Sequence, residues 1–70
     1  MSYLLQVKKA NTINVYSLKY YELKHIQNTD NYELYVMYKD KKNATRFKKI
    51  DYLNEKDFSF ITNKDNYNLL

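Results

Sequence analysis

The chain of 70 residues contains no glycine, no proline and no cysteine, although it has nine tyrosines and three phenylalanines. Glycine ordinarily makes tight turns, because a residue without a Cβ atom adopts a positive φ angle with little strain. In its absence, turns fall to Asn and Asp, which tolerate the left-handed region and hydrogen-bond to their own backbone. The positions of Asn and Asp therefore predict where the chain reverses.

Asn and Asp gather in four clusters that divide the chain into segments of strand length. These clusters are Asn11–Asn14, Asn28–Asn31, Asp40–Asn43 and Asn63–Asn66. Each is flanked by segments rich in tyrosine and aliphatic residues, which favour strands. We therefore expect short strands joined by tight turns.

Alternation with a period of two predicts the strands themselves. In the clearest case, Tyr32, Leu34, Val36 and Tyr38 alternate with Glu33, Tyr35, Met37 and Lys39. A strand over Thr45–Ile50 is its expected hairpin partner. Alternation over residues 3–8 predicts a further strand. The long run Ile13–Gln27 changes phase near residues 19–21, which predicts either two strands or one strand with a bulge.

One short helix is expected near the C-terminal end. Asn54 is a suitable N-cap, and Glu55 and Asp57 place negative charge in the first helical turn. A competing interpretation makes Asp57–Thr62 a final strand. The helix is preferred because the cap and the first-turn acids agree.

These features predict an α+β fold that is mostly β. It consists of an antiparallel meander of four to five strands with one short C-terminal helix, in a single small domain spanning residues 1–70. The alternative is a small all-β barrel of the SH3-like or OB-like kind. Barrels of this size usually turn their corners with glycine, which favours an open sheet.

The missing residue types also exclude most chemistry. Phosphate-cradling loops need glycine, and zinc ribbons and thiol nucleophiles need cysteine. His25 is the only histidine, and on a strand it would face away from the nearby Glu22. We therefore expect a protein that is not an enzyme, with no catalytic residues, no metal site and no cofactor.

Two groups of residues are candidates for recognition. On the predicted strand at 32–39, Tyr32, Leu34, Val36 and Tyr38 would face the core together with Tyr3 and Leu5. The opposite face would carry Glu33, Tyr35, Met37 and Lys39, and would be either partly covered by the helix or exposed. Exposed Tyr and Met flanked by charge are typical of protein-binding surfaces. This face is the candidate protein-binding site.

The second group is a basic hairpin, in a chain whose net charge is +4. It comprises Lys39, Lys41, Lys42, Arg46, Lys48 and Lys49, with Tyr38 and Phe47 interleaved. Lysines that follow phosphates, combined with aromatic rings that stack on bases, are used to bind single-stranded nucleic acid. Lysines beside a turn are also ordinary solvent-exposed residues.

The expected function is thus that of a small non-enzymatic module that binds a protein partner stoichiometrically. The alternative is a small basic protein that binds single-stranded nucleic acid through the Lys39–Lys49 hairpin. Residues with AT-rich codons dominate, which indicates a low-GC genome and favours an inhibitor or anti-defence accessory protein of a phage or other mobile element. A homodimer is a further candidate assembly. No segment predicts membrane insertion or a secretory signal, so we expect a cytoplasmic protein, in the host cytoplasm if it is viral.

Overall fold

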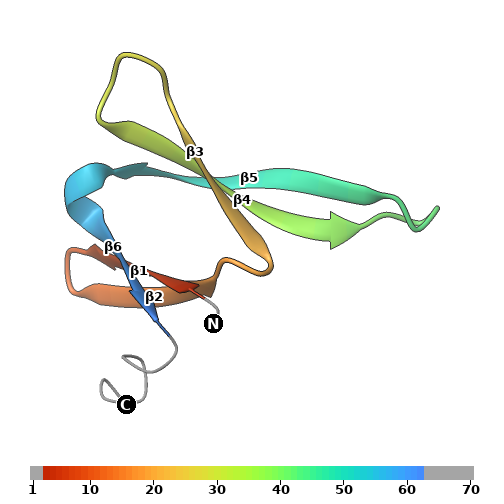
Figure 1. The fold of residues 1–70 in the computed structure, drawn as a ribbon, viewed down its shortest axis with the longest axis horizontal. Helices are drawn as coiled ribbons and strands as arrows, with labels where there is room; N and C mark the ends of the chain where they lie inside the picture. The colour runs from red at the N-terminus through yellow and green to blue at the C-terminus, as the bar shows by residue number, and fades with distance from the viewer. Residues whose placement is uncertain (1–2, 63–70) are drawn as a thin grey trace.

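A computed structural model describes residues 3–62, which form strands and one short 3₁₀ helix (Figure 1). In chain order the elements are β1 (Tyr3–Lys9), β2 (Thr12–Ser17), β3 (Tyr21–His25), β4 (Asn31–Lys39), β5 (Thr45–Asn54), η1 (Glu55–Asp57) and β6 (Phe58–Thr62). The expectation of a mostly β protein is confirmed.

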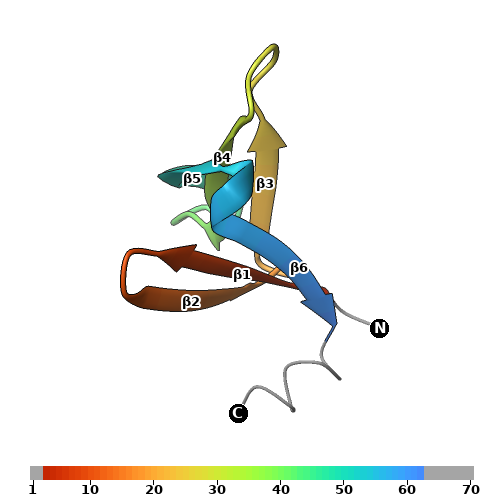
Figure 2. The same ribbon diagram turned by 90° about the vertical axis from the view of Figure 1, so that its left-hand side faces the viewer.

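The strands form two antiparallel sheets, each of three strands. One has the order β2-β1-β6 and the other the order β3-β4-β5. Figure 2 shows β1 and β2 running across the direction of β3. The described strands therefore make neither a single meander nor a closed barrel, because β2 does not pair with β3 and β6 pairs with β1, not with β5.

Four aliphatic side chains form the centre of the core. Leu5 and Val7 come from β1, Leu34 from β4 and Leu53 from β5, and each is at most 2% exposed. The partly buried side chains packed around them are Tyr16, Leu18, Tyr21, Leu23 and Phe58. No polar or charged residue of the described range is buried, so the contact between the two sheets is apolar at its centre. At its margin Lys9 of β1 pairs with Asp51 of β5, with Nζ 3.1 Å from Oδ1.

The expected C-terminal helix is wrong. Asn54 does act as an N-cap: its side chain accepts a hydrogen bond from the Lys56 amide, and the Asp57 side chain accepts one from the Asn54 amide. The cap starts only the 3₁₀ turn η1, after which Phe58–Thr62 forms the strand of the competing interpretation. Full-length pairing of β6 with β1 satisfies the backbone of this segment, and this long-range interaction outweighs the local helix signal.

The run Ile13–Gln27 forms two strands, β2 and β3, which is the first of its two predicted interpretations. The Tyr20 amide donates a hydrogen bond to the Ser17 carbonyl, at 3.0 Å, in the turn between them. The bulge lies instead in β5, which extends past the predicted Ile50 to Asn54. Leu34 is opposite Asp51 and Tyr35 is opposite Lys49, so Ile50 is the extra residue.

Two tyrosines expected in the core are exposed. Tyr3 is 57% exposed and Tyr38 is 45% exposed. Tyr38 is next to last in β4, opposite Arg46. The end of the β4–β5 hairpin extends beyond the β2-β1-β6 sheet (Figure 1), so that sheet does not cover it. Leu34 is fully buried, and Tyr32 and Val36 are half-buried, as the alternation predicted.

Asparagine makes two of the predicted turns in the expected way. Asn28 and Asn43 have φ angles of 65° and 64°, in the left-handed region. Ala10 also has a positive φ, of 51°, in the β1–β2 turn, where its Cβ atom is unfavourable. The fourth predicted cluster, Asn63–Asn66, lies outside the described residues.

Replacing Ala10 with glycine should therefore stabilise the protein. Left-handed alanine costs roughly 1–2 kcal/mol, whereas the greater freedom of glycine in the unfolded chain costs about 0.4–1 kcal/mol. We expect Ala10→Gly to raise the free energy of unfolding by about 0.5–1 kcal/mol in urea titrations. Ala44→Gly is the matched control and should lower it, because Ala44 is not among the residues with positive φ. A loss of stability in Ala10→Gly would contradict the strain at this turn.

Candidate functional site

The strand register defines two faces of the β3-β4-β5 sheet. Residues opposite one another in antiparallel strands share a face, and successive residues alternate between faces. Leu34 and its β3 partner Leu23 face the core. We call the other side the outer face. Its residues are Glu22 and Lys24 on β3, Asn31, Glu33, Tyr35, Met37 and Lys39 on β4, and Thr45, Phe47, Lys49, Tyr52 and Asn54 on β5.

The outer face carries a group of large apolar side chains. Tyr35 is half-buried, while Met37, Phe47 and Tyr52 are 37%, 51% and 55% exposed. Met37 and Phe47 are opposite one another across β4 and β5. The expected helix over this face does not form, which leaves these side chains accessible. Aromatic and methionine side chains in such positions are enriched at protein interfaces.

A hydrogen-bond network centred on Lys49 and Glu33 holds the tyrosines in place. Lys49 Nζ donates to Glu33 Oε2 at 3.0 Å and to the Tyr52 hydroxyl at 2.7 Å. It also lies 4.7 Å from the centroid of the Tyr52 ring. The Tyr35 hydroxyl donates to Glu33 Oε1 at 3.1 Å. One ion pair therefore positions two aromatic rings.

The pKa values of this network follow from its contacts. The hydrogen bonds to Tyr52 and Glu33 raise the pKa of Lys49, which stays charged. The Lys49 ammonium, with a smaller contribution from the Tyr35 hydroxyl, lowers the pKa of Glu33. Desolvation and the hydrogen bond to Glu33 raise the pKa of Tyr35, which stays neutral. The network is thus an ion pair with a neutral Tyr35 at physiological pH.

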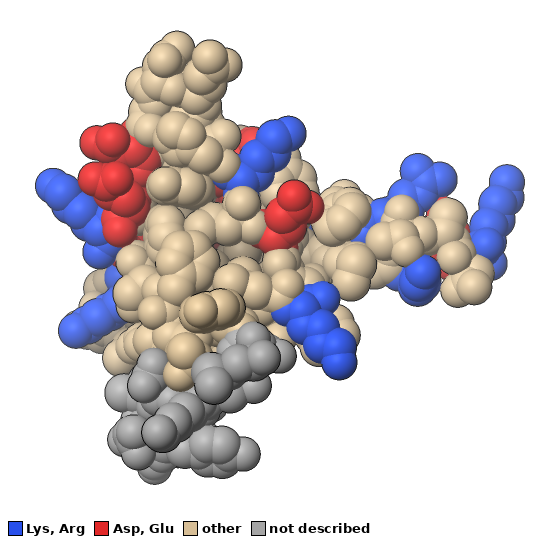
Figure 3. Space-filling model, viewed as in Figure 1, with Lys and Arg blue, Asp and Glu red and all other residues tan. Residues whose placement is uncertain are grey.

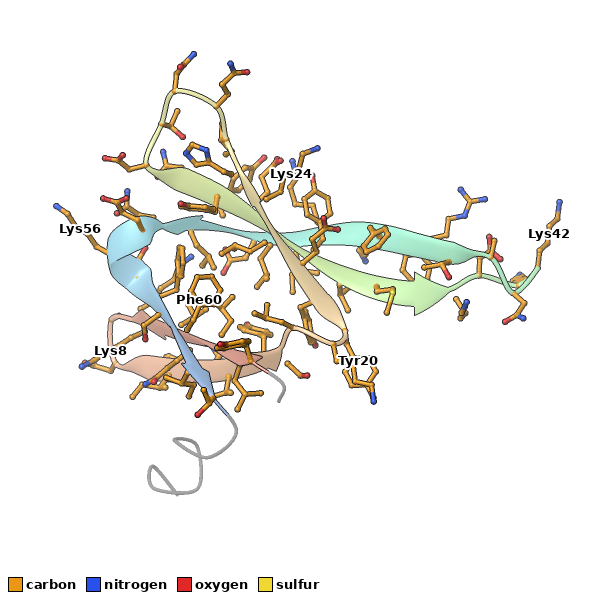
Figure 4. The ribbon with its side chains drawn as sticks, in the orientation of Figure 1. Lys8, Tyr20, Lys24, Lys42, Lys56 and Phe60 are labelled. Carbon is orange, nitrogen blue, oxygen red and sulfur yellow. The ribbon has the colours of Figure 1, made fainter. Side chains whose placement is uncertain are left out.

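An open depression of about 460 Å³ lies beside this network. Four consecutive residues of the edge strand β3, numbers 22–25, line it together with Tyr35 and Phe47. Figure 4 shows Lys24 projecting from β3 on the side away from the β1–β2 hairpin. The depression combines aromatic walls with one glutamate, one lysine and one histidine, a composition suited to an amphipathic side chain.

The residues predicted for protein binding share one face. Glu33, Tyr35, Met37 and Lys39 all lie on the outer face, opposite Leu34. Sequence reasoning did not place Tyr52 there, and assigned Phe47 and Lys49 only to the basic hairpin. The bulge at Ile50 changes the phase of β5 between Lys49 and Asp51, and no sequence signal marks it.

Four of the six basic residues, Lys39, Lys41, Lys42 and Arg46, belong to a projecting hairpin arm, which we define as residues 37–47. Lys48 and Lys49 follow the arm in β5. Figure 3 shows Lys and Arg side chains along this arm and at its tip, and Figure 4 places Lys42 at the far end. The register separates the predicted nucleic-acid-binding residues. Tyr38, Arg46 and Lys48 are on the core-side face, whereas Lys39, Phe47 and Lys49 are on the outer face.

Asp40 organises the tip of the arm. Its Oδ1 accepts hydrogen bonds from the amides of Lys42 and Ala44, at 2.8 and 2.9 Å. Its Oδ2 accepts one from Arg46 Nε at 2.8 Å. Two of the six predicted basic residues, Arg46 and Lys49, therefore neutralise carboxylates of this chain, and Lys41 and Lys42 lie in the turn that Asp40 holds.

The contacts of His25 are with a backbone carbonyl and an aromatic ring. Its Nε2 lies 2.6 Å from the Thr29 carbonyl oxygen, to which it donates, and its ring centroid is 4.9 Å from that of Tyr32.

Between residues 3 and 62, no three His, Asp or Glu side chains are close enough together to hold a metal ion. In the same range no helix has the length and apolar character needed to span a membrane.

Comparison with known proteins gives no relative. No family model matches this chain, and neither curated proteins nor solved structures give a significant match. Functional inference therefore depends on the geometry described above.

The contacts of Asp40 predict a pH-dependent arm tip. The hydrogen bond from Arg46, followed by those from the Ala44 and Lys42 amides, lowers the pKa of Asp40. A lowered folded-state pKa stabilises the tip at higher pH, and this stabilisation is lost as the pH falls through the lowered value.

In an NMR titration, the Lys42 and Ala44 amide resonances should shift together, with a midpoint below the ordinary aspartate value. Asp40→Asn should abolish this transition, while the Leu34 amide in the core reports any global unfolding. A midpoint at or above the ordinary value would mean that Asp40 does not hold the tip.

Proposed function

We propose that this protein is a small non-enzymatic module that binds a protein partner stoichiometrically through its outer face. One observation carries the proposal: Tyr35, Met37, Phe47 and Tyr52 lie together on a sheet face that no other described element covers. Clustered aromatic side chains at the centre of an interface supply most of its binding free energy. Such a module inhibits a larger partner by occupying one of its functional surfaces.

The electrostatics of the face support a protein partner. Its acids, Glu22 and Glu33, nearly balance its bases, Lys24, Lys39 and Lys49. The central base, Lys49, is already paired with Glu33. A surface whose charges are paired internally contributes little to attraction of a polyanion, whereas its ordered tyrosines lose little conformational entropy when a partner binds.

Tyr35 is the residue on which this proposal is tested. Its ring is at the centre of the outer face, and the packing of the core around Leu34 does not depend on it. We expect Tyr35→Ala to weaken partner binding by about thirtyfold, with little change in thermal stability. Partner capture from a nuclease-treated lysate of a low-GC bacterium, followed by titration with the purified partner, measures the effect.

Two control variants separate recognition from folding. Tyr20 is 52% exposed in the turn between β2 and β3, and Tyr20→Ala should leave binding unchanged. Leu34→Ala should do the reverse of Tyr35→Ala and cost about 2–5 kcal/mol of stability as a core truncation. If Tyr20→Ala weakens binding as much as Tyr35→Ala, or if Tyr35→Ala unfolds the protein, the outer face is not the recognition surface.

The alternative function is binding of single-stranded nucleic acid by the hairpin arm. The projecting lysines favour it, but each face of the arm carries one of the two aromatic residues, Tyr38 or Phe47. A nucleic-acid strand that stacks on one of these rings contacts only the basic residues on the same face of the arm. We therefore rank this function second.

If the arm binds nucleic acid, affinity for single-stranded DNA should fall with salt, with a log–log slope of roughly −0.7 per neutralised phosphate. The variant Lys41→Glu with Lys42→Glu should then abolish binding, and Lys8→Glu, remote from the arm, should not. Fluorescence anisotropy with a labelled oligonucleotide measures both. Absence of binding near physiological salt removes this alternative.

A further inference from the structure

The strand β3 presents an unpaired backbone edge. It is the outermost strand of the β3-β4-β5 sheet, so no strand in the described part of the chain pairs with its other side. Such an edge is a template for pairing with a further strand unless charges, bulges or covering elements block it. Figure 2 shows β3 at the margin of the molecule.

Two hydrogen bonds identify the backbone groups on that edge. The Met37 amide donates to the Tyr20 carbonyl and the Ile26 amide donates to the Asn31 carbonyl, both at 2.9 Å. Even-numbered residues of this segment therefore direct their N–H and C=O groups toward β4, because these groups alternate along a strand. The groups of Tyr21, Leu23 and His25 are directed outward.

The sequence of β3 complements itself across this edge. A two-fold axis centred on Leu23 places Glu22 of each copy opposite Lys24 of the other, and Tyr21 opposite His25. The outward-directed groups of residues 21, 23 and 25 then oppose one another, as ladder hydrogen bonds require. Axes centred on residue 22 or 24 would instead oppose two glutamates or two lysines, so charge selects a single register.

We propose that two copies of this chain pair antiparallel through β3, with Leu23 at the two-fold axis, to form a continuous six-stranded sheet. The depression lined by residues 22–25 lies against this edge. Each copy thus places its Glu22 and Lys24 beside the depression of the other. The interface is isologous, and it closes at two copies. This inference does not depend on the proposed function.

The other edge of the same sheet is protected against such pairing. The free edge of β5 carries the bulge at Ile50 and three like charges, Arg46, Lys48 and Lys49. Bulges and repeated lysines are the features that keep edge strands unpaired. By contrast, β3 is regularly paired along its length and its charges alternate in sign.

Charge reversal tests the pairing. Sedimentation equilibrium of the full chain over a range of concentrations should give a monomer–dimer equilibrium. Glu22→Lys makes positions 22 and 24 both lysine, and should weaken dimerisation at least about tenfold. Lys24→Glu makes both positions glutamate and should have the same effect. An equimolar mixture of the two variants should form heterodimers, because every cross-strand pair is then attractive.

Further variants keep the result independent of folding. The double variant Glu22→Lys with Lys24→Glu exchanges the charges and should dimerise like the original chain, even if one single variant folds poorly. Lys8→Glu, on β1, should dimerise normally. The proposal is overturned if the original chain is a monomer at every concentration, if Glu22→Lys dimerises as strongly as the original chain, or if the mixture forms no heterodimer.

Discussion

Four aliphatic side chains hold this protein together. Leu5 and Val7 of one sheet pack against Leu34 and Leu53 of the other, and no disulfide or described metal site supports them. Full burial of a leucine contributes about 1.5–3 kcal/mol to the free energy of folding. A core of so few residues therefore leaves a small margin of stability. The position of the recognition surface also depends on this packing. Because side chains alternate along a strand, burial of Leu34 directs Tyr35 and Glu33 to the opposite face.

Polar side chains replace glycine where the chain must turn. At the tip of the hairpin arm, Asp40 accepts three hydrogen bonds that fix the conformation of the following residues. Asn28 and Asn43 occupy the left-handed region in their turns. These turns are consequently specified by side-chain chemistry, and at the arm tip a single carboxylate makes the contacts that hold the turn.

The sequence predicted well those features that depend on local alternation. The phase of β4 and the turn at Asp40–Asn43 agree with the structure, and Ile13–Gln27 forms two strands, which was one of its two interpretations. It failed where distant segments decide. The N-cap at Asn54 is real, but pairing of β6 with β1, more than fifty residues away in the chain, makes a strand of the segment after it. Tyr38 was placed in the core because alternation defines a face but not how far the opposing sheet extends.

Candidate site residues divide along the same line. Tyr35 and Met37 could be assigned from β4 alone, since one phase holds throughout that strand. Phe47 and Tyr52 could not, because they lie on the same face only through the extra residue at Ile50. Their spacing of five residues would put them on opposite faces of a regular strand.

The bulge at Ile50 separates β5 into two parts whose phases are set independently. On one side, burial of Leu53 fixes which residues face the core. On the other, the Asp40 turn fixes the register of β5 against β4 in the arm. In a continuous ladder these two requirements would have to agree, so inserting or deleting one residue in this stretch of β5 would reverse the faces of one part relative to the other. With the mismatch absorbed at one position, the arm can change its length or its presented side chains through evolution while the body keeps its packing.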